Sequence, residues 1–312
     1  MQTTVHASSE RAAQPVRAGA AFRTPSEQSR LVVPAFVVVW GALVLLPLAV
    51  LFAYSFFESR NFMMVYRPTL NTWGSLFSSG RFEVTLRTLR IALTITVVEF
   101  AIAFPAAVWL AKGRCSKTTR AFVLTLLTIP FFLDLSSRVI VWRGILDAHG
   151  LIATLLVRLH LISGWPQGWL YTEGAVQFGM LITNFPLMIL PIFLAISVID
   201  DALIAAAADL GASPVRILVD VILPLSMPGV LAGIVFTLGP ALASWVEPDM
   251  LGGGFVNMLS DSVDSAYTAL RYPVVAALSS FVIVVIGAIF AVLTLVTRRF
   301  ADLSSTFRSL HR

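Results

Sequence analysis

The chain has 312 residues, of which 57% are hydrophobic and only 12% are charged, and its mean hydropathy is +0.86. A soluble domain carries about a quarter charged residues, so this composition excludes an ordinary soluble globular protein and indicates an integral membrane protein. The formal net charge is +5, which raises the question of a nucleic-acid partner that the distribution of basic residues answers below.

The N-terminal stretch, residues 1–30, is rich in Ala, Ser, Gln and Arg, and this composition predicts a disordered tail. The apolar run that follows, Leu31–Phe57, is longer than the apolar region of a cleaved signal peptide, which spans roughly 7–15 residues. We therefore expect this run to stay in the membrane as an anchor.

Six stretches have the length of about 20 apolar residues that a hydrocarbon core requires. They are Leu31–Phe57, Ile91–Leu110, Ala121–Trp142, Gly174–Ile199, Val221–Val246 and Tyr272–Thr297. The runs are continuous rather than alternating, which favours helices over a β-barrel. We predict an all-α integral membrane protein whose six transmembrane helices occupy residues 31–298, followed by a cytoplasmic tail over residues 299–312.

Lys and Arg residues are concentrated in the two tails and in the loop between the second and third spans, and a single one, Arg216, precedes the fifth span. Basic residues favour the inner side of a bacterial membrane. Both termini and the polar stretch Ile199–Pro224 are therefore predicted to be cytoplasmic. Because topology explains the basic excess, we infer no nucleic-acid partner.

Motifs for catalysis are missing from the sequence. The four histidines lie outside the predicted spans, and there is no HExxH zinc motif, no GxSxG elbow and no GxxxxGK[ST] phosphate loop. Cys115 is the only cysteine, which excludes an intrachain disulfide and a thiolate metal site. We expect no enzymatic activity, no metal and no cofactor in this chain.

Three charged residues fall inside the predicted spans, where each costs roughly 2.5–3.5 kcal/mol on insertion. Asp134 and Arg138 are four residues apart, so a helix would place them on one face and allow them to pair. A structural ion pair and a contribution to a translocation path both remain open. Glu99 leaves the same choice, its structural alternative being a hydrogen bond to Thr or Ser on a neighbouring helix.

The polar stretch Ile199–Pro224 is too helical to be a simple connector. An aspartate pair at its start can cap a helix over Ala202–Leu210, which consists of strong helix formers. Gly211 can take a left-handed conformation that ends this helix, and Pro214 can begin a second helix that runs to Pro224. Two short helices around a glycine elbow indicate a docking surface for another protein, with an ordinary helical loop as the alternative.

Acidic residues close the fifth predicted span on the outer side. Glu247 and Asp249 would attract a cationic solute there, or they belong to a structural loop or to the docking site of an external protein. Trp245 would add a cation–π contact, or it belongs to an interfacial aromatic belt. Gly229 and Gly233 form a GxxxG motif, which permits close helix contact and would suit an interface with a second membrane subunit.

The polar stretch resembles the EAA loop of permease subunits of binding-protein-dependent ABC importers, which reads E-A-A-x-x-x-G followed by I-x-L-P. The matching residues are Ala206, Ala207, Asp209, Leu210, Gly211, Ala212 and Pro224. Ala205 stands where the family has Glu. The resemblance implies a type I importer permease fold, in which this loop is the coupling helix pair that sits in a groove of the ATPase subunit.

Three other segments are similar to those of spermidine/putrescine importer permeases: Thr128–Leu146, Glu247–Asp261 and Arg271–Ser279. Tyr272 and Val275 depart from the family pattern, which has Trp and Gly there. The resemblance covers most of the chain and implies an inner-membrane permease for a small cationic solute such as a polyamine. Permeases for amino-acid derivatives and opines share these segments and remain an alternative.

The resemblance also implies partners: a dimer of ABC ATPase subunits, a second and different permease subunit, a periplasmic substrate-binding protein and the lipid bilayer. The candidate residues of the solute path are Asp134, Arg138, Trp245, Glu247 and Asp249. From the residues alone, two other classes remain open. A secondary transporter driven by an ion gradient should show broken helices and inverted repeats, and a membrane scaffold would leave the charges in the spans without a role.

Overall fold

The computed structural model describes residues 27–60, 63–78, 80–161 and 168–308. Helices dominate, apart from one short hairpin in which β1 (Glu58–Arg60) pairs antiparallel with β2 (Met63–Val65). Six helical segments are long and apolar enough to cross a membrane, which confirms the predicted helical fold with six spans. Most of the predicted N-terminal tail, residues 1–26, lies outside the described residues.

The chain divides into two compact units, Met1–Ala49 and Val50–Arg312. The first unit contains most of α1 (Glu27–Tyr54), which carries the first candidate span, Pro34–Tyr54. Helix α1 begins inside the stretch predicted as a tail, because a helix does not have to start where its apolar run starts. All the other elements belong to the second unit.

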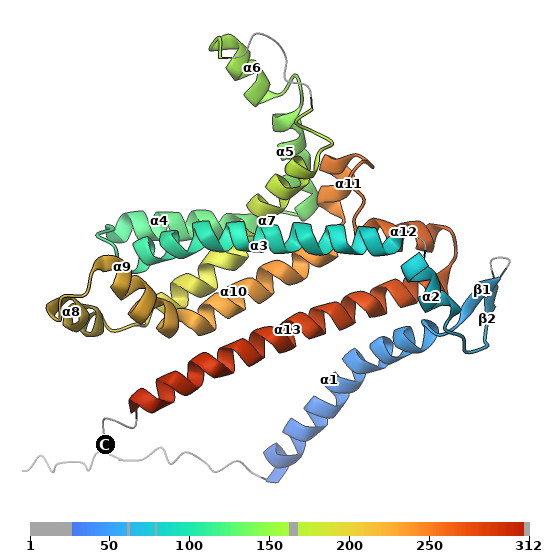
Figure 1. The fold of residues 1–312 in the computed structure, drawn as a ribbon, viewed down its shortest axis with the longest axis horizontal. Helices are drawn as coiled ribbons and strands as arrows, with labels where there is room; N and C mark the ends of the chain where they lie inside the picture. The colour runs from blue at the N-terminus through green and yellow to red at the C-terminus, as the bar shows by residue number, and fades with distance from the viewer. Residues whose placement is uncertain (1–26, 61–62, 79, 162–167, 309–312) are drawn as a thin grey trace, which may run out of the picture. The chain divides into compact units, whose positions relative to one another are not determined.

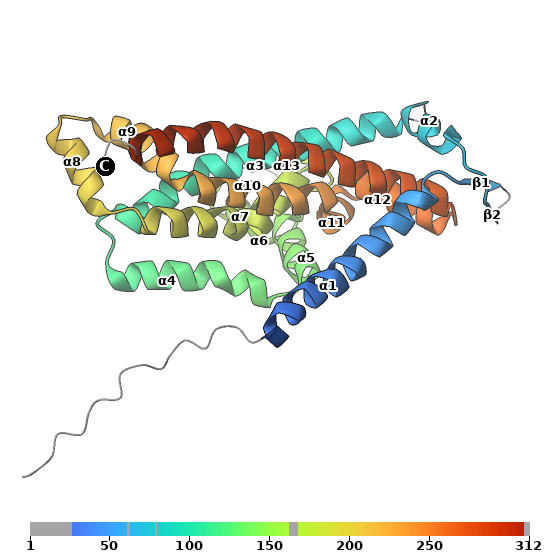
Figure 2. The ribbon, with the colours of Figure 1, turned by 90° about the horizontal axis from the view of Figure 1, so that it is seen from below.

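Three helices form the centre of the second unit: α3 (Arg81–Lys112), α7 (Glu173–Ser197) and α10 (Leu223–Ala243). Their shared apolar core includes fully buried residues such as Ala107 and Ile192. Helix α13 (Tyr272–Arg308) packs beside α10 (Figures 1 and 2) and continues beyond its predicted apolar run. Burial of one face of each helix against the others stabilises this bundle, as expected for close-packed helices.

The GxxxG motif of α10 packs inside this chain. A Cβ added at Gly233 would lie 2.8 Å from the backbone oxygen of Met188, and one added at Gly229 would overlap Pro191 and Ala195 of α7. The two glycines therefore bring the backbones of α10 and α7 together. The predicted role at an interface between two subunits is wrong for these buried glycines, because the contact that they permit is already made within the subunit.

The third predicted span, Ala121–Trp142, is not one helix. Helix α4 (Lys117–Thr128) passes into a 3₁₀ turn, η1 (Ile129–Phe132), and the chain then becomes extended at Leu133. A new helix, α5 (Leu135–Leu146), follows and leads to α6 (Leu151–Arg158). The predicted boundaries were wrong because hydropathy does not register a helix break.

Two local features explain that break. Pro130 has no N–H to donate to the preceding turn. Asp134 takes an extended conformation, and its carboxylate accepts a hydrogen bond from the Ser137 backbone N–H, which starts α5 as an N-cap. Helices α5 and α6 then leave the direction of the bundle (Figure 1), and the third candidate span falls on Leu135–Arg158.

The two ends of the bundle carry different elements. At one end lie α8 (Asp201–Asp209) and α9 (Pro214–Ile217), which belong to the polar stretch between the fourth and fifth spans (Figure 1). At the opposite end lie α2 (Asn71–Ser78), the β1–β2 hairpin and α12 (Leu259–Thr268). Helix α11 (Val246–Gly252) follows α10 and packs against α5 and α7. The predicted coupling loop and the predicted outer carboxylates therefore belong to different ends of the bundle.

Candidate functional site

The coupling loop, defined as Ile199–Pro224, begins with a capped helix. The Asp200 carboxylate accepts a hydrogen bond of 2.9 Å from the Ala202 backbone N–H at the start of α8. Gly211 ends the helix with φ +82°, in the left-handed region. Its N–H bonds to Ala208 O at 2.9 Å, and the Ala212 N–H bonds to Ala207 O at 3.1 Å. These two bonds form a Schellman motif, which explains why glycine stands at this position.

The second helix of the loop does not end at Pro224, as the sequence had suggested. Ser213 caps α9, and Pro214 takes its first position. The chain then passes through a π-helical turn, η2 (Leu218–Ile222), directly into α10. Pro224 has no N–H to bond back into the preceding turn, and the wider π turn accommodates this proline without ending the helix. A displacement of α9 therefore acts on a continuous helical path into the membrane.

The predicted coupling residues form an exposed surface on this loop. Ala206, Asp209, Leu210, Gly211 and Pro224 are exposed. The other two, Ala207 and Ala212, are half-buried. Leu210 is 89% exposed, an unusual position for a large apolar side chain on a polar loop. Exposed apolar groups gathered in this way are typical of a protein-docking surface.

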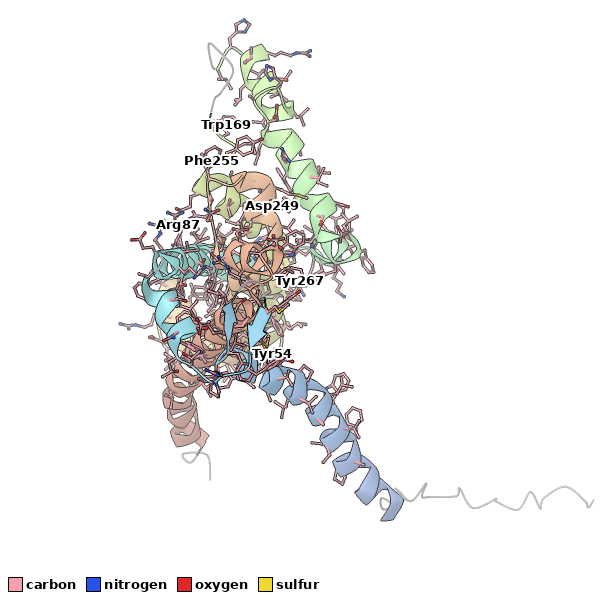
Figure 3. The ribbon with its side chains drawn as sticks, turned by 90° about the vertical axis from the view of Figure 1, so that its right-hand side faces the viewer. Tyr54, Arg87, Trp169, Asp249, Phe255 and Tyr267 are labelled. Carbon is pink, nitrogen blue, oxygen red and sulfur yellow. The ribbon has the colours of Figure 1, made fainter. Side chains whose placement is uncertain are left out.

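A pocket of about 800 Å³ is lined by residues of the consecutive helices from α10 to α13. We call it the acidic pocket, because Asp249, Asp261 and Asp264 line it together with the aromatic rings of Trp245 and Tyr267. Apolar side chains of α10 and α13 complete its wall. Figure 3, which looks onto the end of the bundle that carries α12, labels Asp249 and Tyr267. The carboxylates suit a positively charged solute, and the rings offer cation–π contacts.

Asp261 is the carboxylate of the acidic pocket that is held by a backbone hydrogen bond. It is half-buried, and its Oδ2 accepts a hydrogen bond of 2.7 Å from the Met258 backbone N–H. Burial raises the pKa of Asp261 above its usual value, and the nearby negative charges of Asp249 and Asp264 act in the same direction. A bound cation would offset this mutual repulsion, because an opposite charge stabilises the ionised form.

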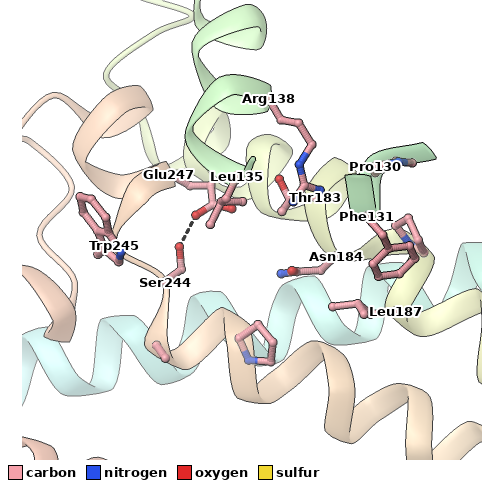
Figure 4. Close-up of a pocket in the computed structure, with 13 residues that line it drawn as sticks. Pro130, Phe131, Leu135, Arg138, Thr183, Asn184, Leu187, Ser244, Trp245 and Glu247 are labelled. Atoms are coloured by element: carbon pink, nitrogen blue, oxygen red, sulfur yellow. Dashed lines mark hydrogen bonds between the residues drawn. The ribbon is translucent and has the colours of Figure 1, made fainter. Parts of the chain in front are cut away.

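A second pocket, of about 460 Å³, lies between α5, α7 and α10, and we call it the bundle pocket (Figure 4). It brings together Arg138, Trp245 and Glu247, three of the five residues predicted for the solute path. Glu247 is buried, and its carboxylate accepts a hydrogen bond from the Ser244 hydroxyl. Asn184 is only 4% exposed, and its amide extends toward the pocket without a hydrogen-bond partner among the described residues.

Trp245 lines both pockets, whereas Asp249 lines the acidic pocket alone. Asp134 lines neither pocket, because it is the N-cap of α5. The predicted ion pair between Asp134 and Arg138 is not formed in the described part of the chain, since Asp134 precedes the helix instead of sharing its face. The Nε atom of Arg138 is buried without a hydrogen-bond partner.

Glu99 is fully buried on α3, and both of its carboxylate oxygens lack a hydrogen-bond partner. The buried Thr237 hydroxyl of α10 faces it, but the geometry falls short of a hydrogen bond. Thr237 therefore occupies the position of the predicted hydrogen-bond partner of Glu99 on a neighbouring helix, but the bond itself is not formed.

Among the pocket residues that sequence reasoning missed are Asn184, Asp261, Asp264 and Tyr267. Asn184 could have been noticed as an amide in an otherwise apolar span. Asp261 and Asp264 are three residues apart, so a helix places them on neighbouring positions of one face. Among the described residues, no group of three His, Cys, Asp or Glu side chains could hold a metal ion.

A family profile described as the binding-protein-dependent transport system inner membrane component matches residues 100–305. This match covers the C-terminal part of α3, all of α7 and α10, the coupling loop and both pockets. The chain belongs to this family. It is a permease subunit of an ABC importer and a multi-pass protein of the inner membrane, and it functions with an ATPase and a periplasmic binding protein.

Two curated relatives carry the name spermidine/putrescine transport system permease protein PotB. The protein from Haemophilus influenzae is 31% identical over 230 residues, which cover 73% of this chain and 79% of the relative. The protein from Escherichia coli K12 is 30% identical over 220 residues, which cover 70% and 79%. A solved bacterial alginate ABC transporter is similar in fold, with a TM-score of 0.70 over 88% of this chain and 96% of the other at 17% identity.

Membership in the family confirms that this permease is not an enzyme, since ATP is hydrolysed in a separate subunit. It also sets aside the two other classes that the residues alone had left open, the secondary transporter and the structural scaffold. Proposals about the solute, the second permease subunit and individual residues rest on the geometry of the pockets and the coupling loop.

Proposed function

We propose that this permease forms the path by which a small cationic solute, such as a polyamine, enters a bacterial cell at the expense of ATP. The observation that carries the proposal is the acidic pocket, in which Asp249, Asp261 and Asp264 meet Trp245 and Tyr267. Three carboxylates with no basic residue in the same lining favour a cation over an anion or a neutral sugar. The names of the two curated relatives point to the same class of solute.

In this proposal the acidic pocket faces the periplasm and the coupling loop faces the cytoplasm. The basic residues on the loop side of the chain favour that orientation. A binding protein would release its solute over the acidic pocket. A second and different permease subunit would complete the wall of the path, and each permease would present one coupling loop to one ATPase subunit.

Movement of the solute would follow from movement of the coupling loop. Leu210 and Gly211, with the neighbouring alanines, would occupy the groove of the ATPase. Closure of the ATPase dimer on ATP would displace the loop, and η2 would pass that displacement to α10. Trp245, at the end of α10 and shared by both pockets, would then change its position between them.

The test is uptake of labelled putrescine or spermidine by proteoliposomes that contain the whole complex and loaded binding protein. We expect Asp249→Asn and Asp264→Asn each to raise the KM several-fold, because an exposed charge pair contributes about 0.2–1 kcal/mol, and the double variant to raise it further. Ser262→Asn is the control, since Ser262 lies beside Asp261 but does not line the acidic pocket. Unchanged KM in the double variant would refute the assignment of a cationic solute.

A second class of solute is favoured by one observation. The bundle pocket contains Arg138, a cation whose Nε atom has no hydrogen-bond partner, close to the buried Glu247. A solute with both an amino group and a carboxylate, such as an amino-acid derivative or an opine, would suit such a pair. Competition decides between the two: excess unlabelled ornithine that blocks uptake more strongly than excess putrescine would favour the amino-acid class.

A further inference from the structure

Lys112 joins three elements at the coupling-loop end of the bundle. It is the last residue of α3, and its side chain is only 14% exposed. Its Nζ atom donates one hydrogen bond of 2.5 Å to the backbone oxygen of Ile199, which follows α7, and another of 2.6 Å to Asp201 Oδ1 at the start of α8. One ammonium group therefore ties α3 and the end of α7 to the coupling loop.

The two bonds of Lys112 differ in character. The bond to Ile199 O satisfies a carbonyl at the C-terminal end of α7, where the helix dipole also favours a cation. The bond to Asp201 is made by a carboxylate that is 84% exposed, so water competes for it. The buried bond to the Ile199 backbone oxygen should therefore provide most of the stabilisation that Lys112 contributes, and the Asp201 bond should add little.

Neighbouring contacts stabilise the position of the coupling loop around Lys112. Arg120 on α4 donates a hydrogen bond of 3.2 Å to the Ala111 backbone oxygen, one residue before Lys112. Ile204 of α8 and Ile217 of α9 pack against the core shared by α3 and α7. The coupling loop thus has an exposed surface on one side and a defined attachment to two membrane helices on the other.

We propose that Lys112 is a positioning residue that holds the start of the coupling loop against α3 and transmits displacement of the loop to α3. The coupling loop reaches α10 through the continuous helical path of α9 and η2. The corresponding link to α3 is the Lys112 side chain. A loop displaced by the ATPase would then act on α3 directly as well as on α10, whereas without Lys112 the displacement would reach α3 only through apolar packing such as that of Ile204 and Ile217. This inference rests on the proposed docking of the coupling loop on the ATPase.

The experiment uses the assembled complex of permease, ATPase and binding protein in proteoliposomes. We expect Lys112→Met to lower solute uptake at least tenfold and to abolish the stimulation of ATP hydrolysis by loaded binding protein, while basal hydrolysis and the yield of complex stay at wild-type levels. Lys112→Arg should keep uptake within about threefold of wild type, and Asp201→Ala within about twofold. Lys117→Met is the matched control, because Lys117 is an exposed lysine at the start of α4.

A merely structural role would lower the yield of complex and leave the solute transported per ATP unchanged in the surviving fraction. Stimulated hydrolysis and normal uptake in Lys112→Met would overturn the inference. If Lys112→Met does not assemble, Lys112→Gln carries the test, since it keeps a neutral donor: a severalfold loss of solute transported per ATP supports the inference, and full coupling overturns it.

Docking itself is measured separately, with Leu210→Cys in a Cys115→Ser background and a bifunctional cross-linker. Absence of a cross-link to the ATPase in otherwise unchanged permease would contradict the proposed docking. A cross-link together with full coupling in Lys112→Met would overturn only the inference about Lys112.

Discussion

Replacement of Gly211 separates the backbone requirement of the coupling loop from its docking requirement. Gly211 has φ +82°, and nothing lies within 4 Å of a Cβ added there. Any effect of a small side chain in the isolated permease must therefore come from backbone strain and not from a clash. A large side chain adds bulk only where the permease meets another protein.

The size of the strain follows from the left-handed conformation. In this conformation a residue other than glycine is destabilised by roughly 1–2 kcal/mol of conformational free energy. Asparagine is destabilised less, because it tolerates this region. A loss of 1–2 kcal/mol changes the ratio of ordered to disordered loop by a factor of about 5–30. The loop is exposed and ends a short helix, so its fraying should leave insertion and folding of the spans intact.

Three variants distinguish the two requirements: Gly211→Asn, Gly211→Ala and Gly211→Trp. We expect Asn to keep most of the uptake, Ala to reduce it several-fold, and Trp to abolish it because its ring would obstruct the proposed docking of the coupling loop on the ATPase. The assay is ATP-dependent uptake in proteoliposomes, and the amount of membrane-inserted permease is measured in parallel. All three variants should insert at wild-type levels.

Normal uptake by Gly211→Trp would refute this reasoning, since the glycine elbow would then not lie in a tight interface. Equal losses for Asn and Trp at equal levels of insertion would show that the loop requires glycine for a reason other than its backbone conformation.

Two further predictions concern packing and charge. Gly233→Leu should destabilise the solubilised permease by about 1–3 kcal/mol through overpacking, because its Cβ would meet Met188 O at 2.8 Å; Gly239→Leu, with open space around its Cβ, is the control, and equal melting temperatures would contradict the α7–α10 contact. Burial and neighbouring carboxylates raise the pKa of Asp261, so as pH falls this carboxylate takes up a proton at a higher pH than an ordinary aspartate. Wild-type uptake should therefore decline at a less acidic pH than uptake by Asp261→Asn, and identical pH profiles would count against a role for Asp261.

The elements near the coupling loop were predictable because their determinants are local. Asp200 caps the helix that follows it, and Gly211 takes the left-handed conformation that a Schellman motif requires. Each depends only on backbone groups a few residues away. The end of the second helix was predicted wrongly at Pro224, because a proline can also be accommodated by a π turn within a longer helix.

The pockets were only partly predictable, because each depends on how several helices pack against one another. Arg138, Trp245 and Glu247 were recognised by their type, and the bundle pocket brings them together. Asn184 was missed, because an amide in a membrane span stands out only when it has no hydrogen-bond partner, and the sequence does not show which partners it has. Lys112 looked like one of many basic residues of an inner loop until its bonds to Ile199 and Asp201 were visible.

By itself the sequence determined the class of protein, the number of spans and the motif of the coupling loop, because these follow from composition and from interactions over a few residues; the sidedness that the basic residues suggest stays a prediction. Only the tertiary structure decided that the GxxxG motif packs within the subunit, that Arg138, Trp245 and Glu247 line one pocket, and that the acidic side chains of α11 and α12 share another. Those outcomes depend on how α5, α7, α10 and α13 meet. Contacts between helices are made by residues far apart in the chain, and periodicity and hydropathy carry no information about them.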